Sequence, residues 1–389
     1  MKGHRYDCLL AIGGDSFIDG DKAALPELDA FLKNKDWVFG HLSYELKNAF
    51  FPASKSRPDR IGFPLFYFFE PIILLAIQGT ELCIQASDPE AIFSAIHEQT
   101  LLEKKPFNSI SINQSLSKKK YIEKITALQR HIQQGDCYEI NFCQEFFSDE
   151  AVIDPLLVYQ QLVKLSPTPY AAFYKINGSY LLCASPERFL QKEGNKLLAQ
   201  PMKGTAKRVH GDSIGDETAA AKLKASPKEQ AENVMIVDLM RNDLSKICQD
   251  GTVTVSELFG IHTFPQVHQM VSTIEGKLQD GICFSDILEA TFPMGSMTGA
   301  PKKRVIELID QYETSARGLF SGSVGYFHKG DFDINVVIRS IQYNEQTAYL
   351  SYSVGSGITI YSDPEGEWEE CILKGEAIKK VLTQGSALC

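Results

Sequence analysis

The sequence predicts an α+β protein in which sheets and helices form separate layers. Segments with strand patterns and segments with helix patterns follow one another irregularly, without the strand–helix–strand rhythm of a doubly wound parallel sheet. The 389 residues, of which 44% are hydrophobic and 23% charged, have an ordinary globular composition and are too many for one small domain. We therefore expect a large core, arranged either in two lobes or in one elaborate unit.

The N-terminal part of the chain carries the weaker patterns. A charged and polar stretch from Leu102 to Lys120 is the best candidate boundary, so we divide the chain into residues 1–110 and 111–389. The elements expected before this boundary are strands at 8–12, 65–69 and 72–77 and a helix at 88–99.

Sharper patterns follow the boundary. Apolar residues recur at helical spacing from Tyr121 to Ile132, and Gly135 suits the end of that helix. Segment 137–147 alternates with a period of two, which places Glu139 and Asn141 on one face of a strand. Asn177-Gly178, between two strand patterns, indicates a hairpin turn. The remaining expected elements are a helix at 227–244, strands at 322–327 and 350–360, and a last helix that begins at Pro364 with Asp363 as its cap.

Charge and hydrophobicity limit the partners of the chain. With 39 basic and 49 acidic residues the net charge is −10, which argues against nucleic acid. The most apolar run, 61–77, is broken by Pro64, Glu70 and Pro71, whereas a membrane span needs about 20 apolar residues. Nine scattered cysteines without a CxxC pair, and an N-terminus without a signal-peptide pattern, lead us to expect free thiols and a cytoplasmic protein.

Two pairs of glutamates are spaced to lie on single helix faces. Glu229 and Glu232 follow Pro227, and Glu367 and Glu370 follow Pro364. Facing helices would bring together four carboxylates, an oxygen-rich environment that suits Mg²⁺. Lys374, four residues after Glu370, would lie on the same face and could meet an anionic group. From spacing alone, a solvated helix surface explains these residues more simply.

Two glycine-rich segments could approach an anion with their backbone amides. Gly355-Ser356-Gly357 follows a strand pattern, although a plain glycine-rich turn is the simpler interpretation. It lacks the third glycine of a dinucleotide-binding motif, and segment 295–302 lacks the Gly-Lys-Ser/Thr ending of a P-loop.

Two further residues could take part in acid–base or covalent chemistry. Lys203, in Pro-Met-Lys-Gly-Thr, could be a buried nucleophile, and Glu187, in Ser-Pro-Glu-Arg, could be a general acid if burial raises its pKa. An exposed loop lysine and a surface ion pair are the alternatives that the local pattern favours.

Seven ordered segments resemble those of the chorismate-binding enzymes, which include anthranilate synthase component I, aminodeoxychorismate synthase component I, and the isochorismate and salicylate synthases. The segments are GDCYEINFCQEF (135–146), SPERF (185–189), PMKGTAKR (201–208), ENVMIVDLMRNDLSKI (232–247), VHQMVSTIEG (267–276), FPMGSMTGAPKKRVIELID (292–310) and EWEECILKGEAI (367–378). The resemblance implies layered β-sheets in the centre with helices outside, and an N-terminal portion woven into the same fold.

The resemblance also implies a magnesium site. Glu232 and Glu370 would bind Mg²⁺ directly, with Glu229 and Glu367 supporting through water, and the ion would grip a carboxylate of chorismate. Lys374 would add positive charge near that group.

Further substrate contacts are implied for residues elsewhere in the chain. Arg339 would bind the pyruvyl carboxylate, and Glu187 would protonate the departing C4 hydroxyl. Thr298 and the amides of Gly355, Ser356 and Gly357 would complete the anion site.

Two positions point to one branch of the family. Lys203 resembles the lysine of the aminodeoxychorismate synthases, where anthranilate and isochorismate synthases typically carry alanine. Isochorismate and salicylate synthases carry a lysine base where this chain has Glu139. The resemblance thus implies amination of chorismate at C4 to give 4-amino-4-deoxychorismate, a precursor of 4-aminobenzoate and folate. Lys203 would attack C2 covalently, which requires a depressed pKa because only the neutral amine is nucleophilic.

Glu139 departs from the family pattern. Relatives usually carry glutamine there, on the face shared with Asn141. A carboxylate at this position would either deprotonate incoming ammonium or act only as a structural acceptor.

Partners follow from the same resemblance. Ammonia would come from a glutamine amidotransferase subunit, since the chain has no G-x-C-x-G motif. An aminodeoxychorismate lyase would act next. The alternatives are anthranilate synthase component I, a non-catalytic subunit that senses chorismate or an amino acid, and a Mg²⁺ enzyme for another dicarboxylate.

Overall fold

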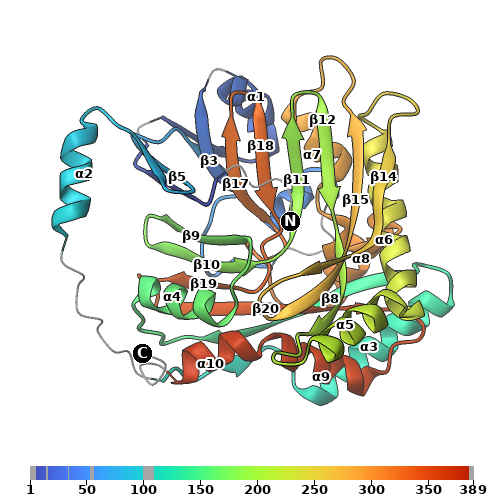
Figure 1. Ribbon diagram of the computed structural model, residues 1–389. Coiled ribbons are helices and arrows are strands. Elements are labelled where there is room, and N and C mark those ends of the chain that lie inside the picture. The colour runs from blue at the N-terminus through green and yellow to red at the C-terminus, as the bar shows by residue number, and fades with distance from the viewer. Residues whose placement is uncertain (1–5, 15, 34, 53–56, 100–108, 385–389) are drawn as a thin grey trace.

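Two large antiparallel sheets meet in the centre of the protein, and helices cover their outer faces (Figure 1). The computed structural model describes residues 6–14, 16–33, 35–52, 57–99 and 109–384. The strands of one large sheet run across those of the other in Figure 1. This layered arrangement confirms the α+β class.

The first large sheet has ten strands, which come from both of the predicted parts of the chain, residues 1–110 and 111–389. Its strands, in spatial order, are β13 (Met202–Lys207), β15 (Val267–Lys277), β12 (Lys196–Gln200), β11 (Arg188–Glu193), β18 (Asp331–Asn335), β17 (Ser323–His328), β3 (Trp37–Leu42), β4 (Phe66–Phe69) and β2 (Phe17–Gly20), with β14 (Thr254–Thr263) paired to β15. The pairing of β3 with β17 joins residues before 110 to residues after 111 in one sheet. The predicted boundary falls in part on residues 100–108, which lie outside the described residues.

The second large sheet has seven strands and carries the alternating segment predicted from the sequence. Its strands are β16 (Gly299–Ala300), β8 (Glu139–Ser148), β20 (Tyr349–Ile358), β19 (Ser340–Asn344), β10 (Ser179–Ser185) and β9 (Tyr170–Ile176), with β7 (Asn113–Gln114) paired to β8. The hairpin between β9 and β10 turns at Asn177 and Gly178, whose φ angles are 52° and 120°, as their sequence predicts.

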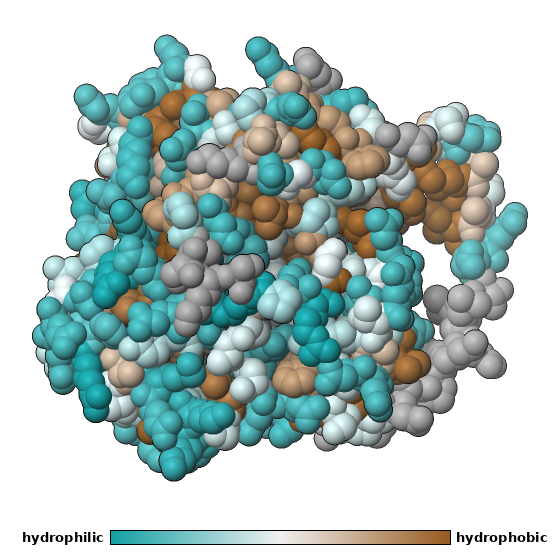
Figure 2. Space-filling view, turned by 180° about the vertical axis from the view of Figure 1, so that it is seen from behind, coloured by the Kyte–Doolittle hydropathy of each residue, from teal (hydrophilic) through white to brown (hydrophobic). Residues whose placement is uncertain are grey.

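A small third sheet stands apart from the other two. It consists of β1 (Cys8–Ile12), β5 (Ile73–Gln78) and β6 (Glu81–Gln85). Apolar side chains of this sheet remain at the surface, where Leu10, Ile12, Ile77 and Leu82 are exposed, and the view from behind shows apolar area on this side of the molecule (Figure 2).

The helices lie outside the sheets. They are α1 (Leu25–Lys33), α2 (Pro89–Glu98), α3 (Lys118–Gln133), α4 (Pro155–Leu165), α5 (Ser213–Lys224), α6 (Pro227–Ser245), α7 (Phe284–Thr291), α8 (Lys302–Tyr312), α9 (Pro364–Lys374) and α10 (Glu376–Gln384), with the 3₁₀ turns η1 (Lys22–Ala24), η2 (Tyr44–Ala49) and η3 (Gly295–Met297). Of these helices, α2 contacts strand β6 of the small sheet rather than a large one. One core lies under α1, α6 and α7, and a second lies under α3, α4, α8 and α10.

Several predicted termini are correct, and one helix is not. Pro227 and Pro364 open α6 and α9, and Asp363 accepts a hydrogen bond from the amide of Gly366 as a cap. The helix that begins at Pro364 is not the last one, because α9 ends at Lys374 and α10 follows Gly375. Among the described residues, no helix is both long and apolar enough to span a membrane.

Candidate active site

A buried contact between Lys203 and Glu139 joins the two large sheets. Lys203 lies in β13, at the edge of the ten-stranded sheet, and Glu139 opens β8 in the other sheet. Nζ of Lys203 donates a hydrogen bond to Oε1 of Glu139 and lies 3.9 Å from Oε2 of Glu232. The side chains of Lys203 and Glu139 are only 12% and 2% exposed, so Lys203 is not an exposed loop lysine.

The electrostatic state of Lys203 differs from the prediction. Burial alone lowers the pKa of Lys203, but the negative charges of Glu139 and Glu232 outweigh burial and raise the pKa above its usual value. The predicted depressed pKa is therefore wrong for the arrangement in this structure. Local sequence could not reveal this, because Glu139 is 64 positions away from Lys203 along the chain.

Glycines make room for this contact. Gly355, Ser356 and Gly357 lie inside β20 and do not form the turn that their composition favours. A Cβ atom on Gly357 would lie 2.7 Å from Oε1 of Glu139 and 3.1 Å from Nζ of Lys203. The backbone of β20 thus lies directly against the Lys203–Glu139 ion pair. A side chain at Gly357 would push the two charged groups out of place.

Glu187 lies immediately before β11 and is buried. Desolvation raises its pKa to about 7, although a hydrogen bond with Ser296 and the charges of Lys203 and Arg339 act in the opposite direction. The condition that the sequence set for a general acid, a pKa raised by burial, is met. A carboxyl group with this pKa can hold a proton near neutral pH and release it to a reacting group.

Arg339 supplies a positive charge close enough to Glu187 for the two groups to affect each other's pKa. Its backbone takes a positive φ of 49° at the start of the segment that leads into β19. No hydrogen bond or ion pair joins its guanidinium to another described residue, and burial lowers its pKa against the opposing effect of Glu187. A guanidinium without such a partner can donate two parallel hydrogen bonds to a bound carboxylate.

Asn141 and Thr298 are held by one another and by the turn η3. The amide of Asn141 donates to the carbonyl of Thr298 over 2.7 Å, and its Nδ2 donates to the carbonyl of Ser296 over 3.0 Å. The Thr298 hydroxyl donates to the carbonyl of Met294 over 3.1 Å, so it faces the turn.

The four predicted glutamates come from two helices that approach the Lys203 contact. On α6, Glu232 lies 3.9 Å from both Lys203 and Lys228, and burial, together with Glu139 and Glu229, raises its pKa to about 7 against the effect of Lys203. A Cβ on Gly204 would lie 2.7 Å from Oε2 of Glu229, which places that carboxylate beside β13.

The carboxylates of α9 are already engaged. Glu367 accepts a hydrogen bond from the Ser356 hydroxyl. Nζ of Lys374 lies 2.7 Å from Oε1 of Glu370 and 3.2 Å from the carbonyl of Gly355. Burial raises the pKa of Glu370, but the positive charges of Lys374, Lys228 and Lys203 lower it by more. The net pKa of Glu370 is therefore below its usual value.

The carboxylates suit Mg²⁺ in their chemistry and leave most of its coordination to other oxygens. Among the described residues, no three carboxylate, thiol or imidazole groups come close enough together to hold a metal ion. Mg²⁺ commonly binds through one or two carboxylates, with water and substrate oxygens filling the remaining positions. Oε2 of Glu139 is buried without a hydrogen-bond partner among the described residues, so the region has unused oxygen capacity. The glutamates therefore fit a Mg²⁺ site in which water and substrate oxygens supply the remaining ligands.

Sequence reasoning did not single out Ser296, Arg317 or Glu313. Ser296 contacts Glu187, and Arg317 and Glu313 form a buried ion pair against β8. Ser296 is two positions before Thr298, so its position in the 292–310 segment was the available signal. Arg317 and Glu313 lie outside the seven segments and gave none.

Comparisons with known proteins show which family this chain resembles. A model of the family described as chorismate binding enzyme matches residues 16–380. Aminodeoxychorismate synthase component 1 of Salmonella typhimurium is 37% identical over 289 residues, which cover 74% of this chain and 63% of that protein. An anthranilate synthase component I-like protein of Synechocystis is 33% identical over 359 residues, which cover 89% and 72%.

Other relatives are much longer than this chain. Arabidopsis thaliana aminodeoxychorismate synthase, chloroplastic, is 43% identical over 265 residues, which cover 67% of this chain but 28% of that protein.

Among solved structures, anthranilate synthase component I of Streptococcus pneumoniae shares the fold, with a TM-score of 0.85 at 21% identity and coverage of 96% of this chain and 92% of that one. The family match over most of the chain and the relatives above 30% identity lead to one conclusion: this chain belongs to the chorismate binding enzyme family.

Proposed function

We propose that this chain is the chorismate-aminating component of an aminodeoxychorismate synthase, which converts chorismate and ammonia to 4-amino-4-deoxychorismate. The observation that carries the proposal is the buried Lys203, whose amine lies against Glu139 in the joint between the sheets. Relatives named aminodeoxychorismate synthase, 36–43% identical to this chain, support it.

In the first proposed step the neutral amine of Lys203 attacks C2 of chorismate. The ring double bonds shift, the C4–O bond breaks, and the departing hydroxide takes the proton of Glu187 and leaves as water. Because the amine of Lys203 must first lose a proton, Glu139, its hydrogen-bond acceptor, is the available base. The covalent bond divides one difficult substitution into two easier ones.

In the second step ammonia attacks C4, and the double bonds shift back. The C2–N bond to Lys203 then breaks, which releases 4-amino-4-deoxychorismate and restores the amine. Over both steps C4 exchanges a hydroxyl for an amino group, water is the other product, and no oxidant or reductant is consumed.

The remaining predicted residues would bind the substrate. Arg339, which makes no hydrogen bond or ion pair with another described residue, would take the pyruvyl carboxylate. Lys374 and Asn141 would surround the other carboxylate, together with the amides of Gly355, Ser356 and Gly357. Thr298 would join them by turning its hydroxyl away from the carbonyl of Met294.

Glu232 and Glu370 would hold Mg²⁺, with Glu229 and Glu367 in support. When bound, Mg²⁺ supplies the positive charge that neutralises a carboxylate of chorismate. In support of this assignment, Glu367 is buried and the side chain of Glu232 is only 13% exposed, while Glu370, which is 43% exposed, lies where a bound ion could be reached from solvent.

The ammonia would come from a glutamine amidotransferase partner, and a lyase would convert the product to 4-aminobenzoate. The name component 1, carried by the Salmonella relative, supports an enzyme of more than one component. We expect the isolated chain to use ammonium salts and not glutamine, and glutamine turnover by the purified chain would refute this.

Anthranilate synthase component I is the second candidate. The specific observation in its favour is the Synechocystis relative, which matches 89% of this chain and carries an anthranilate synthase-like name. Lys203 argues against it, since a covalent amine at C2 would block the position that anthranilate synthesis must aminate.

Trapping of the covalent intermediate tests the proposal. The chain is incubated with chorismate and Mg²⁺ but without ammonia, and intact and peptide masses are recorded. We expect an adduct on the peptide that contains Lys203, absent from Lys203→Ala and removed by ammonium. Full amination activity in Lys203→Ala would exclude the covalent scheme.

A further inference from the structure

Strand β8 has a gap in the pairing along one of its edges. At that edge β16 pairs with Glu139 and Ile140, and β7 pairs with Phe146 and Phe147. Between them the carbonyl of Asn141 and the amide of Cys143 have no partner strand. Unpaired backbone groups at a buried position cost free energy, so something must take the place of the missing strand.

A buried ion pair fills this gap. Nη2 of Arg317 donates to the carbonyl of Asn141 over 3.0 Å, and Oε1 of Glu313 accepts from the amide of Cys143 over 2.9 Å. The two side chains also bond to each other, with 3.0 Å from Nε to Oε2 and 2.6 Å from Nη2 to Oε1. Together they offer β8 one donor and one acceptor, as a neighbouring strand would.

Arg317 also holds the turn that faces the catalytic residues. Its Nη1 donates to the carbonyl of Met297 in η3 over 2.8 Å. The neighbouring Ser296 forms a hydrogen bond with Glu187 through its side chain, and its carbonyl accepts a hydrogen bond from Nδ2 of Asn141. One guanidinium thus fixes β8 and η3 relative to each other, and Glu187 depends on η3 for a hydrogen bond.

We infer that Arg317 and Glu313 form a positioning pair for the reaction, which sets the placement of Glu187 and Asn141 without touching substrate. The inference rests on the proposed function for its assay. Misplacement of a catalytic group by about 1 Å can cost about a hundredfold in rate, so loss of the pair should act mainly on kcat.

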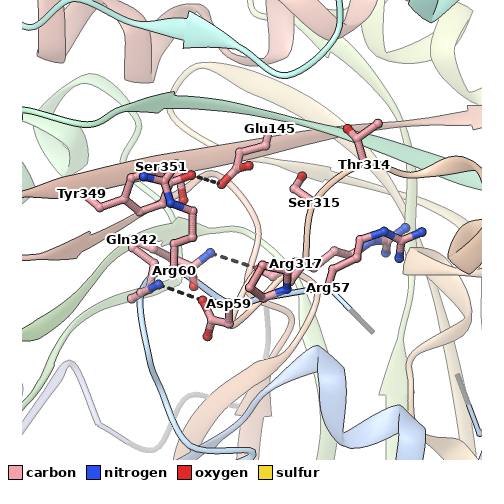
Figure 3. Close-up of a pocket in the computed structure, with 13 residues that line it drawn as sticks. Arg57, Asp59, Arg60, Glu145, Thr314, Ser315, Arg317, Gln342, Tyr349 and Ser351 are labelled. Atoms are coloured by element: carbon pink, nitrogen blue, oxygen red, sulfur yellow. Dashed lines mark hydrogen bonds between the residues drawn. The ribbon is translucent and has the colours of Figure 1, made fainter. Parts of the chain in front are cut away.

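The surroundings of Arg317 offer a chemical test. Arg317 lines a cavity of about 160 Å³ together with Glu145, Gln342 and Tyr349 (Figure 3). Arg60 lines the same cavity and is 48% exposed, so the cavity reaches the surface. Truncation of Arg317 would empty the volume of its guanidinium next to this cavity, and a free guanidinium ion that enters the cavity could refill that volume.

The experiment compares Arg317→Ala and Arg317→Lys with the unchanged chain, using chorismate, Mg²⁺ and ammonium. We expect kcat to fall by about a hundredfold with KM for chorismate changed by less than about threefold. Millimolar guanidinium should restore the Arg317→Ala rate at least about fivefold. Arg317→Lys, which keeps the charge, protects the test if the alanine variant does not fold.

A second buried ion pair provides the matched control. Lys47 and Asp310 lie 2.9 Å apart and are 2% and 3% exposed. Asp310 lies in α8, which ends next to Glu313, and among the described residues no hydrogen bond joins either side chain to β8. Lys47→Met should lower the melting temperature comparably while kcat stays within about threefold. An Arg317→Lys rate within threefold of the unchanged chain, an equal loss in Lys47→Met, or no guanidinium rescue in a folded Arg317→Ala would overturn the inference. Inactivity of the unchanged chain would count against the proposed function instead.

Discussion

Replacement of Glu187 by glutamine should stabilise the fold while it removes activity. Folding raises the pKa of Glu187 from 4.5 to about 7, and each pKa unit corresponds to about 1.36 kcal/mol. Ionised Glu187 therefore costs the folded state about 3 kcal/mol, a cost that neutral glutamine does not carry.

The pH range of this effect follows from the direction of the shift. Well below pH 4.5 the carboxyl is protonated in both the folded and the unfolded state, so it imposes no penalty. Between pH 4.5 and 7 the unfolded state ionises first, and the folded state loses stability as the pH rises. Glu187→Gln should thus raise the free energy of unfolding by about 3 kcal/mol at pH 8.5 and by less than about 1 kcal/mol at pH 5.

Urea unfolding at the two pH values measures this difference. Glu81→Gln is the matched control, because Glu81 is exposed and its replacement should give the same small effect at both pH values. The kcat of Glu187→Gln should fall by about 10²- to 10⁴-fold as the general acid is lost. A gain in stability that is equal at pH 5 and pH 8.5, or absent at pH 8.5, would refute the argument that burial sets the state of Glu187.

Three further perturbations probe the joint between the sheets. Lys203→Met should destabilise the fold by about 3 kcal/mol because it leaves the buried Glu139 unpaired; the double variant with Glu139→Gln should recover most of this loss in a urea-unfolding cycle, and an additive result would contradict the coupling. Gly357→Ala should lower kcat about a hundredfold, because its Cβ would lie 2.7 Å from Oε1 of Glu139; an unchanged steady-state rate would show that β20 can yield. Glu232→Gln and Glu370→Gln should weaken Mg²⁺ binding at least about tenfold by calorimetry in the presence of chorismate; unchanged binding would move the metal elsewhere.

Local patterns predicted the elements that carry the site because each depends on nearby residues. Proline at the first helical position and an aspartate cap place the start of α9, and alternation along β8 puts Glu139 and Asn141 on one face. The turn at Asn177 and Gly178 follows from their tolerance of positive φ. Such signals require no knowledge of the tertiary fold.

Long-range contacts account for what the sequence could not predict. The raised pKa of Lys203 depends on a glutamate in another sheet, and the role of Arg317 depends on a gap in strand pairing. The break at Gly375 between α9 and α10 is a single glycine in an otherwise helical pattern, which local propensity tolerates. The pKa of Lys203 and the role of Arg317 both depend on how the sheets are assembled, which local sequence does not define.

Product identity tests the central claim most directly. The purified chain is given chorismate, Mg²⁺ and ammonium, and the products are separated by chromatography with and without an added aminodeoxychorismate lyase. We predict 4-aminobenzoate only when the lyase is present, since the proposed reaction ends at 4-amino-4-deoxychorismate. Anthranilate or isochorismate formed without the lyase would contradict the account and show that Lys203 does not determine the product.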